Sequence, residues 1–117
     1  MDRVELFKQI LATYEGHGWK ISRALLKPGT RDELSEHANE LLPDALIDSD
    51  FDALWFARPS HAGREAWELR LLTAQPYALF EAFEADEVEA DREEARREME
   101  NRMREHAAQG ESPNVSA

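Results

Sequence analysis

The 117-residue sequence contains no cysteine. This absence excludes disulfides, thiolate metal sites, iron–sulfur clusters and cysteine nucleophiles. The sequence also lacks an apolar run of the about 18 residues that a membrane-spanning helix needs. It opens with Met1-Asp2-Arg3 rather than with a basic and then apolar leader, so we expect a soluble cytoplasmic protein.

Basic residues are scarce relative to acidic ones. Fourteen Lys and Arg side chains stand against twenty-five Asp and Glu, which gives a formal net charge of -11. A charge of this sign repels phosphate backbones and anionic lipid surfaces. We therefore expect neither direct nucleic-acid binding nor membrane binding. The acidic excess lies mainly toward the end of the sequence, because residues 81–117 hold twelve acidic and five basic side chains.

Apolar residues are nevertheless frequent enough for one folded domain. They make up 42% of the sequence and include three tryptophans, although the mean hydropathy is -0.67. This combination indicates a folded part followed by a much more polar part. We predict a single α+β domain over 1–85, an acidic helix over 86–109 that is a candidate interaction arm, and a disordered tail over 110–117.

Two helices are predicted in the first 42 residues. Apolar side chains recur at spacings of three and four over 3–15, as they do on an amphipathic helix. A second helix is predicted over 31–42. Thr30 and Glu33 have the spacing of a capping box, in which each side chain binds the other residue's backbone N–H.

The middle of the sequence gives the clearest β signal. Two aromatic-rich segments, 51–58 and 64–72, flank a turn cluster and predict a central hairpin. A five-residue loop gives a register in which Trp55 faces Trp67. Because this register also brings the two arginines beside the loop together, a shift by one or two residues stays open.

Two shorter segments fit either a strand or a helix. Apolar residues alternate over 19–26, which favours a strand. Propensity favours a helix over 77–83, but a hairpin alone is only marginally stable, and a short return connection favours a third strand there. The predicted fold is therefore α+β. It has a small antiparallel sheet of about three to four strands, two N-terminal helices packed on it, and a long charged C-terminal helix.

Acidic residues before the hairpin raise the question of a calcium loop. Asp48, Asp50 and Asp52 alternate as the first ligands of such a loop do. The match then fails, because Ala53 and Pro59 stand where the loop requires glycine and a bidentate glutamate. A solvated approach to a strand accounts for these aspartates better than a calcium site does.

An alternative function is a small metal-dependent hydrolase or nuclease-like enzyme, which needs carboxylates gathered around a divalent ion. The carboxylates that it would use are Asp50, Asp52, Glu65 and Glu68. The polar face of a half-buried sheet explains Glu68 better. The four histidines are scattered and show no metal-binding spacing. We therefore assign no catalytic, cofactor-binding or metal-ligating residue.

The favoured function is a non-enzymatic protein–protein interaction module that binds another protein or a second copy of itself. The candidate interaction residues are Met99, Met103, Trp55 and Trp67. Tryptophan anchors interfaces at low entropic cost, and methionine adapts to irregular surfaces, although both residue types also fill cores. A second alternative is an acidic inhibitor that imitates nucleic acid and occupies a basic groove.

Overall fold

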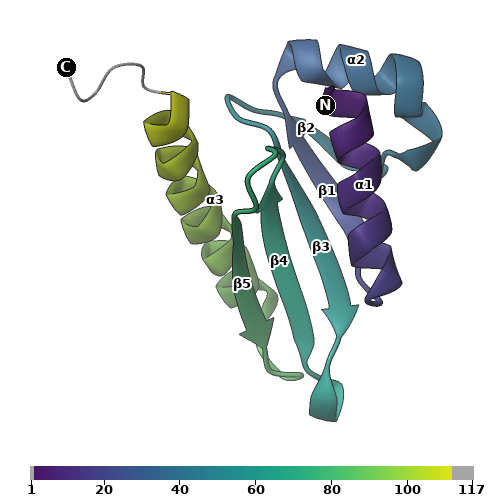
Figure 1. Cartoon of the computed structure of the whole chain (residues 1–117). Coiled ribbons are helices and arrows are strands. Elements are labelled where there is room, and N and C mark those ends of the chain that lie inside the picture. Colours follow the sequence, from purple (N-terminus) through teal and green to yellow (C-terminus); the bar gives the residue numbers. More distant parts are fainter. Residues whose placement is uncertain (1, 112–117) are drawn as a thin grey trace.

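The computed structural model describes residues 2–111 (Figure 1). Its elements, in chain order, are α1 (Arg3–Gly16), β1 (Lys20–Leu26), α2 (Pro28–Ala38), the 3₁₀ turn η1 (Asn39–Leu41), β2 (Leu46–Asp48), β3 (Ala53–Pro59), the 3₁₀ turn η2 (His61–Gly63), β4 (Glu65–Leu71), β5 (Ala78–Phe83) and α3 (Glu89–Glu111). The strands form one five-stranded sheet in the order β2-β1-β3-β4-β5. The predicted α+β class with a long C-terminal helix is confirmed, but the sheet has five strands rather than three to four and is mixed rather than antiparallel.

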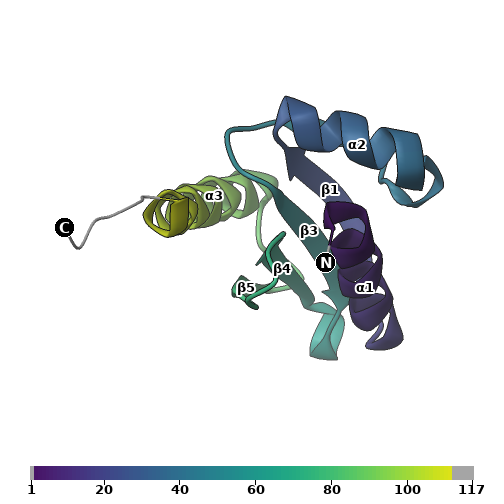
Figure 2. The same ribbon diagram turned by 45° about the horizontal axis from the view of Figure 1, so that its top comes forward.

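Helices lie on both faces of the sheet. Figure 1 and Figure 2 show α1 and α2 on one side and α3 on the other, so the molecule has three layers. Each side has its own apolar cluster. One contains residues of α1 and α2, whereas the other contains Met99 and Met103 of α3. The sheet therefore contributes side chains to two separate hydrophobic cores, one on each face.

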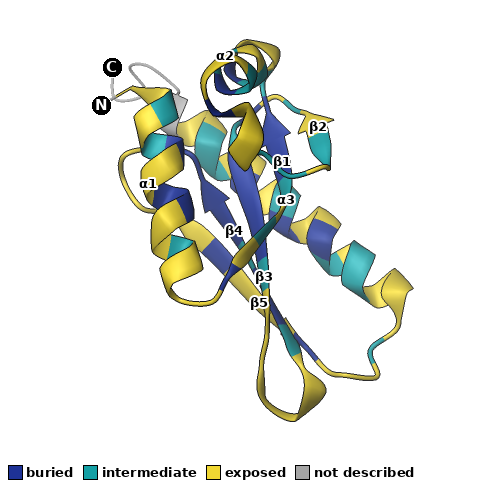
Figure 3. Cartoon of the chain, turned by 90° about the vertical axis from the view of Figure 1, so that its right-hand side faces the viewer, coloured by how far each residue is buried: buried dark blue, intermediate teal, exposed yellow. Residues whose placement is uncertain are grey.

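Strand β3 contributes to both cores. Leu54 and Phe56 belong to the α1-side cluster, while Ala53 and Trp55 belong to the α3-side cluster. All four are buried, as the dark central ribbon in Figure 3 shows. A strand covered on both faces needs apolar residues at consecutive positions rather than at alternate ones. The unbroken apolar run from Ala53 to Phe56 meets this requirement.

Strand β1, predicted over 19–26, changes faces at a bulge. Ile21 pairs with Phe56, but Arg23 pairs with Trp55, so the register shifts between the two β1 residues. Simple alternation would place Ile21 and Leu25 on one face. The bulge instead puts Ile21 against the α1-side cluster and Leu25 in the α3-side cluster.

The predicted start of the second helix is wrong. Helix α2 begins at Pro28, and its N-cap, Lys27, makes no side-chain capping bond. Proline suits a first helical position because that position needs no backbone donor. The predicted capping box of Thr30 with Glu33 does not form, because the Thr30 hydroxyl donates to Asp52 instead, at 2.9 Å. Asp52 also accepts the Lys27 backbone N–H at 2.8 Å, so a residue far along the chain contacts the start of α2.

The central hairpin is confirmed, with a register shifted by two residues. Trp55 pairs with Leu69, and Trp67 pairs with Ala57. Ala62 and Gly63 adopt positive φ angles of 57° and 76° in the turn. The shift separates the arginines beside the loop, and it keeps both tryptophans on one face. Their rings meet edge to face, with centroids 5.9 Å apart.

The two edge strands of the sheet are β5 and β2. The predicted strand over 77–83 is confirmed as β5, an antiparallel neighbour of β4. Strand β2 was not predicted, because three residues are too few to show a pattern. It pairs parallel to β1. Helix α3 extends to Glu111, and the remainder of the predicted tail, 112–117, lies outside the described residues.

We predict that Met103→Ala lowers the free energy of unfolding by about 2–5 kcal/mol, because this fully buried side chain fills the core between α3 and the sheet. Urea denaturation measures the change. The matched control is Val88→Ala, at an exposed apolar residue just before α3, which should change stability by less than about 0.5 kcal/mol. Equal effects of the two variants would contradict the described packing.

Candidate functional site

The four carboxylates of the hydrolase hypothesis lie in different places. Glu68 is on the α1 side of the sheet, where its carboxylate accepts a hydrogen bond from the Tyr14 hydroxyl. Glu65 contacts α3 on the opposite side, at 3.0 Å from the Arg92 guanidinium. Two glutamates on opposite faces of one strand cannot ligate the same ion.

The two aspartates also have separate partners. Asp50 pairs with Arg104 at 3.0 Å, and this hydrogen bond lowers the pKa of the Asp50 carboxyl. Asp52 instead accepts hydrogen bonds from the Lys27 backbone N–H and the Thr30 hydroxyl, at 2.8 and 2.9 Å. Within residues 2–111, no three acidic or histidine side chains are grouped as a metal site requires.

The four candidate interaction residues are all buried in the core between the sheet and α3. They are Trp55, Trp67, Met99 and Met103. The indole N–H of Trp55 donates to Glu100 of α3, and that of Trp67 donates to Glu65, each at 2.9 Å. A partner would reach these side chains only after α3 had moved away from the sheet.

An arginine of α3 lies between the two tryptophans. The Arg96 guanidinium is 4.8 Å from the ring centroid of Trp55 and 4.2 Å from that of Trp67. Its Nε donates to Glu93, while Nη1 has no hydrogen-bond partner in the described chain. Only 9% of the residue is exposed, and this burial lowers the pKa of Arg96. Cation–π contact thus fixes α3 to the sheet.

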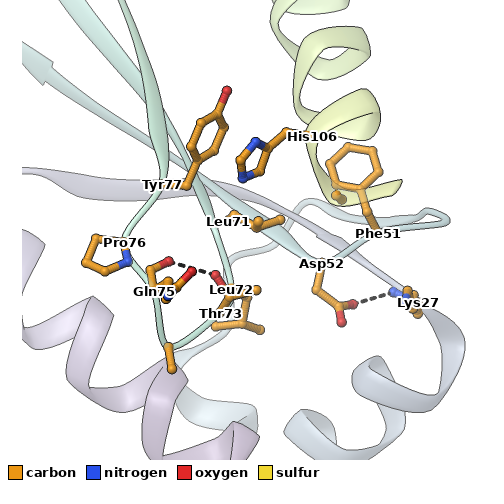
Figure 4. Close-up of a pocket in the computed structure, with 12 residues that line it drawn as sticks. Lys27, Phe51, Asp52, Leu71, Leu72, Thr73, Gln75, Pro76, Tyr77 and His106 are labelled. Atoms are coloured by element: carbon orange, nitrogen blue, oxygen red, sulfur yellow. Dashed lines mark hydrogen bonds between the residues drawn. The ribbon is translucent and has the colours of Figure 1, made fainter. Parts of the chain in front are cut away.

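A cleft of about 490 Å³ lies where the β4–β5 connection meets the start of α2 and the end of α3. Figure 4 shows its apolar wall of Phe51 and Leu71 and the parallel rings of Tyr77 and His106, whose centroids are 3.5 Å apart. The Thr73 hydroxyl donates to a backbone carbonyl rather than to a base, so it is not activated as a nucleophile. The cleft shows no catalytic arrangement among the described residues.

The other candidate site is the outer edge of β5. Ala78, Phe80 and Ala82 alternate along this edge strand, and their side chains are exposed on the α1 side of the sheet. Phe80 is 58% exposed, the same fraction as Val88 and the largest value among the large apolar side chains of the described chain. An apolar strip therefore follows a strand that has a neighbour on one side only.

The apolar strip continues into a group of aromatic residues. Phe80 meets the Trp19 ring edge to face, with centroids 6.3 Å apart. Tyr14 contacts Trp19 in the same way and stacks on Phe56 at 4.0 Å. A depression of about 260 Å³ lies beside them, lined in part by Tyr14, Trp19 and Glu68. The edge thus offers backbone hydrogen-bonding groups and one exposed aromatic ring, that of Phe80, packed against the buried Trp19.

Sequence reasoning missed Phe80 as a site residue. The signal was present, because β5 reads Ala-Leu-Phe-Glu-Ala-Phe and has apolar residues on both faces. Such a pattern does not show which face of the strand is exposed. In the structure, only Leu79 and Phe83 of this strand are buried.

Comparison with protein-family models, curated proteins and solved structures finds no match to this chain. Among the described residues, no helix combines the length and apolar character needed to cross a membrane.

We predict that Tyr14→Phe removes part of the pH dependence of stability at alkaline pH. Burial, followed by the hydrogen bond and charge of Glu68, raises the pKa of Tyr14 above its usual value of 10.0. The unfolded chain ionises at lower pH than the folded chain, so this contribution is complete below about pH 10 and declines as the pH rises further.

Denaturation of both proteins at about pH 8 and about pH 11 measures the effect. The stability advantage of the wild type over Tyr14→Phe should be smaller at the higher pH. Tyr77→Phe is the control for removal of a tyrosine hydroxyl elsewhere. An advantage that stays constant or grows would contradict the assignment.

Proposed function

We propose that this chain is a non-enzymatic protein–protein interaction module and that the outer edge of β5 is its contact surface. The observation that carries the proposal is the apolar edge strand β5, whose exposed Phe80 packs against Trp19. Extended segments add to such edges by main-chain hydrogen bonding, and alternate side chains provide specificity. A cytosolic location is part of the proposal, since the chain has no cysteine.

The chemistry of β5 supports this role. Sheet edges are commonly protected by lysine, proline, bulges or very short strands. Strand β5 has six residues, contains neither lysine nor proline, has Glu81 as its single charged residue, and keeps a continuous register with β4. The opposite edge, β2, has only three residues, and its Asp48 forms an ion pair with Arg31. Only the β5 edge therefore offers a long template.

The arrangement of charged groups favours binding over catalysis. Glu65, Glu68 and Asp50 each pair with a side chain of a helix, which is a structural role. No separate observation favours an acidic mimic of nucleic acid. Two of the α3 glutamates are already engaged within the chain, since Glu93 accepts a hydrogen bond from Arg96 and Glu100 accepts one from Trp55.

We predict that the β5 edge binds a blocked ten-residue peptide in which valine and lysine alternate. This peptide has a high β-propensity, and its charge is opposite to that of the acidic chain. NMR titration should shift and protect the backbone amides of residues 78, 80 and 82. Binding should weaken as salt is added, because the attraction between opposite charges is screened.

The test variant is Ala82→Pro, which removes an outward backbone N–H and keeps the pairing with β4. It should weaken peptide binding by about tenfold or more. Ile47→Glu, on the opposite edge, is the matched control and should leave the affinity unchanged. Absence of binding by the monomeric chain at millimolar peptide, or amide shifts confined to the cleft beside Tyr77, would overturn the proposal.

A further inference from the structure

We infer that a second copy of this chain occupies the β5 edge through antiparallel β5–β5 pairing about a two-fold axis at Phe80. The inference rests on the proposed function and deepens it by naming the partner. It would join two five-stranded sheets into one continuous sheet. Closed two-fold symmetry uses the same surface on both copies, so the strand must be complementary to itself.

The backbone groups of alternate β5 residues point away from the sheet. The Leu71 N–H donates to the Tyr77 carbonyl oxygen at 3.0 Å, which makes this a hydrogen-bonded pair of the β4–β5 ladder. Hydrogen-bonded pairs alternate along an antiparallel ladder. Leu79, Glu81 and Phe83 therefore bond to β4, whereas the backbone groups of residues 78, 80 and 82 point away from the sheet.

The outward backbone groups limit the registers in which two β5 strands can pair. Outward groups must meet outward groups, so even-numbered residues pair with even-numbered residues across the axis. Two such registers overlap five strand residues, one centred on Phe80 and one centred on Glu81. The second register would place the two Glu81 carboxylates directly opposite each other, and like charges in that position are destabilising. The register centred on Phe80 is therefore favoured.

The register centred on Phe80 creates compatible side-chain pairs. Ala78 lies opposite Ala82 of the second copy, and Leu79 lies opposite its Glu81. Phe80 lies opposite Phe80, an aromatic cross-strand pair flanked on each copy by Trp19, its edge-to-face neighbour at 6.3 Å. No like charges are paired directly, and the two exposed phenylalanines cover each other.

Net charge gives the association a definite salt dependence. Each copy carries a formal charge of -11, so two copies repel each other at long range. Added salt screens this repulsion and should strengthen the dimer. A basic extended segment of another protein would show the opposite dependence. The sign of the salt effect therefore distinguishes the two occupants.

The decisive experiment is a charge-swap pair at the symmetry axis. Wild-type protein should have twice the chain mass of 13.4 kDa in sedimentation equilibrium at high concentration and moderate salt. Phe80→Glu and Phe80→Lys should each have the single-chain mass, because like charges then face each other on the axis. An equimolar mixture of the two variants should regain the double mass.

Ile47→Glu, on the β2 edge, is the control and should keep the wild-type mass. Circular dichroism and thermal unfolding of each variant confirm that it is folded. A wild-type chain that is monomeric at millimolar concentration would overturn the inference. A dimer that persists in both Phe80 variants, or a mixture that does not reassociate, would overturn it as well.

The two proposals fail in distinguishable ways. A monomeric wild-type protein that still binds the valine–lysine peptide at residues 78, 80 and 82 refutes the second copy and leaves the interaction module in place. A monomer that does not bind the peptide refutes both proposals. A dimer that uses the β5 edge must compete with the peptide, so the apparent peptide affinity should fall as the protein concentration rises.

Discussion

The fold depends on burying β3 on both of its faces. Leu54 and Phe56 require cover from one side, and Trp55 requires it from the other. A sheet with helices on one face only would leave one of these sets in water, at a cost of about 1.5–3 kcal/mol for each large side chain. The positions of α1, α2 and α3 follow from this requirement, as does the bulge that divides β1 between the two cores.

Helix α3 covers the face of the sheet that contains Trp55, and it does so with few apolar residues. Its apolar stripe is thin, and Met99 and Met103 are its two fully apolar contacts of large size. Arginine completes the layer, because Arg96 lies over both tryptophan rings, and Arg104 lies over Phe51 at 5.2 Å. A helix that reads as solvated by composition therefore packs in the core, since guanidinium groups serve as flat partners for aromatic rings.

Local patterns predicted those elements that local physics determines. The periodicity over 3–15 and the aromatic hairpin were sufficient for α1, β3 and β4, and the need for a third strand identified β5. The features that were missed do not show in the residue pattern, because one depends on a contact between distant residues and the other on backbone angles within a turn. Helix α2 begins at Pro28, and its first turn is tied to Asp52, which accepts hydrogen bonds from the Lys27 backbone N–H and the Thr30 hydroxyl. The hairpin register is set by backbone angles at Ala62 and Gly63 that no alternation pattern reports.

The candidate site was unpredictable for a related reason. Strand β5 has apolar residues on both faces, and the sequence cannot show which face has a covering helix. Helix α3 covers Leu79 and Phe83, whereas the α1-side cluster contains no β5 residue among those described. Phe80 is exposed because α1 and α2 lie over the opposite half of the sheet. The apolar residues on one face of β5 pack under α3, and the apolar residues on its other face leave an exposed apolar edge.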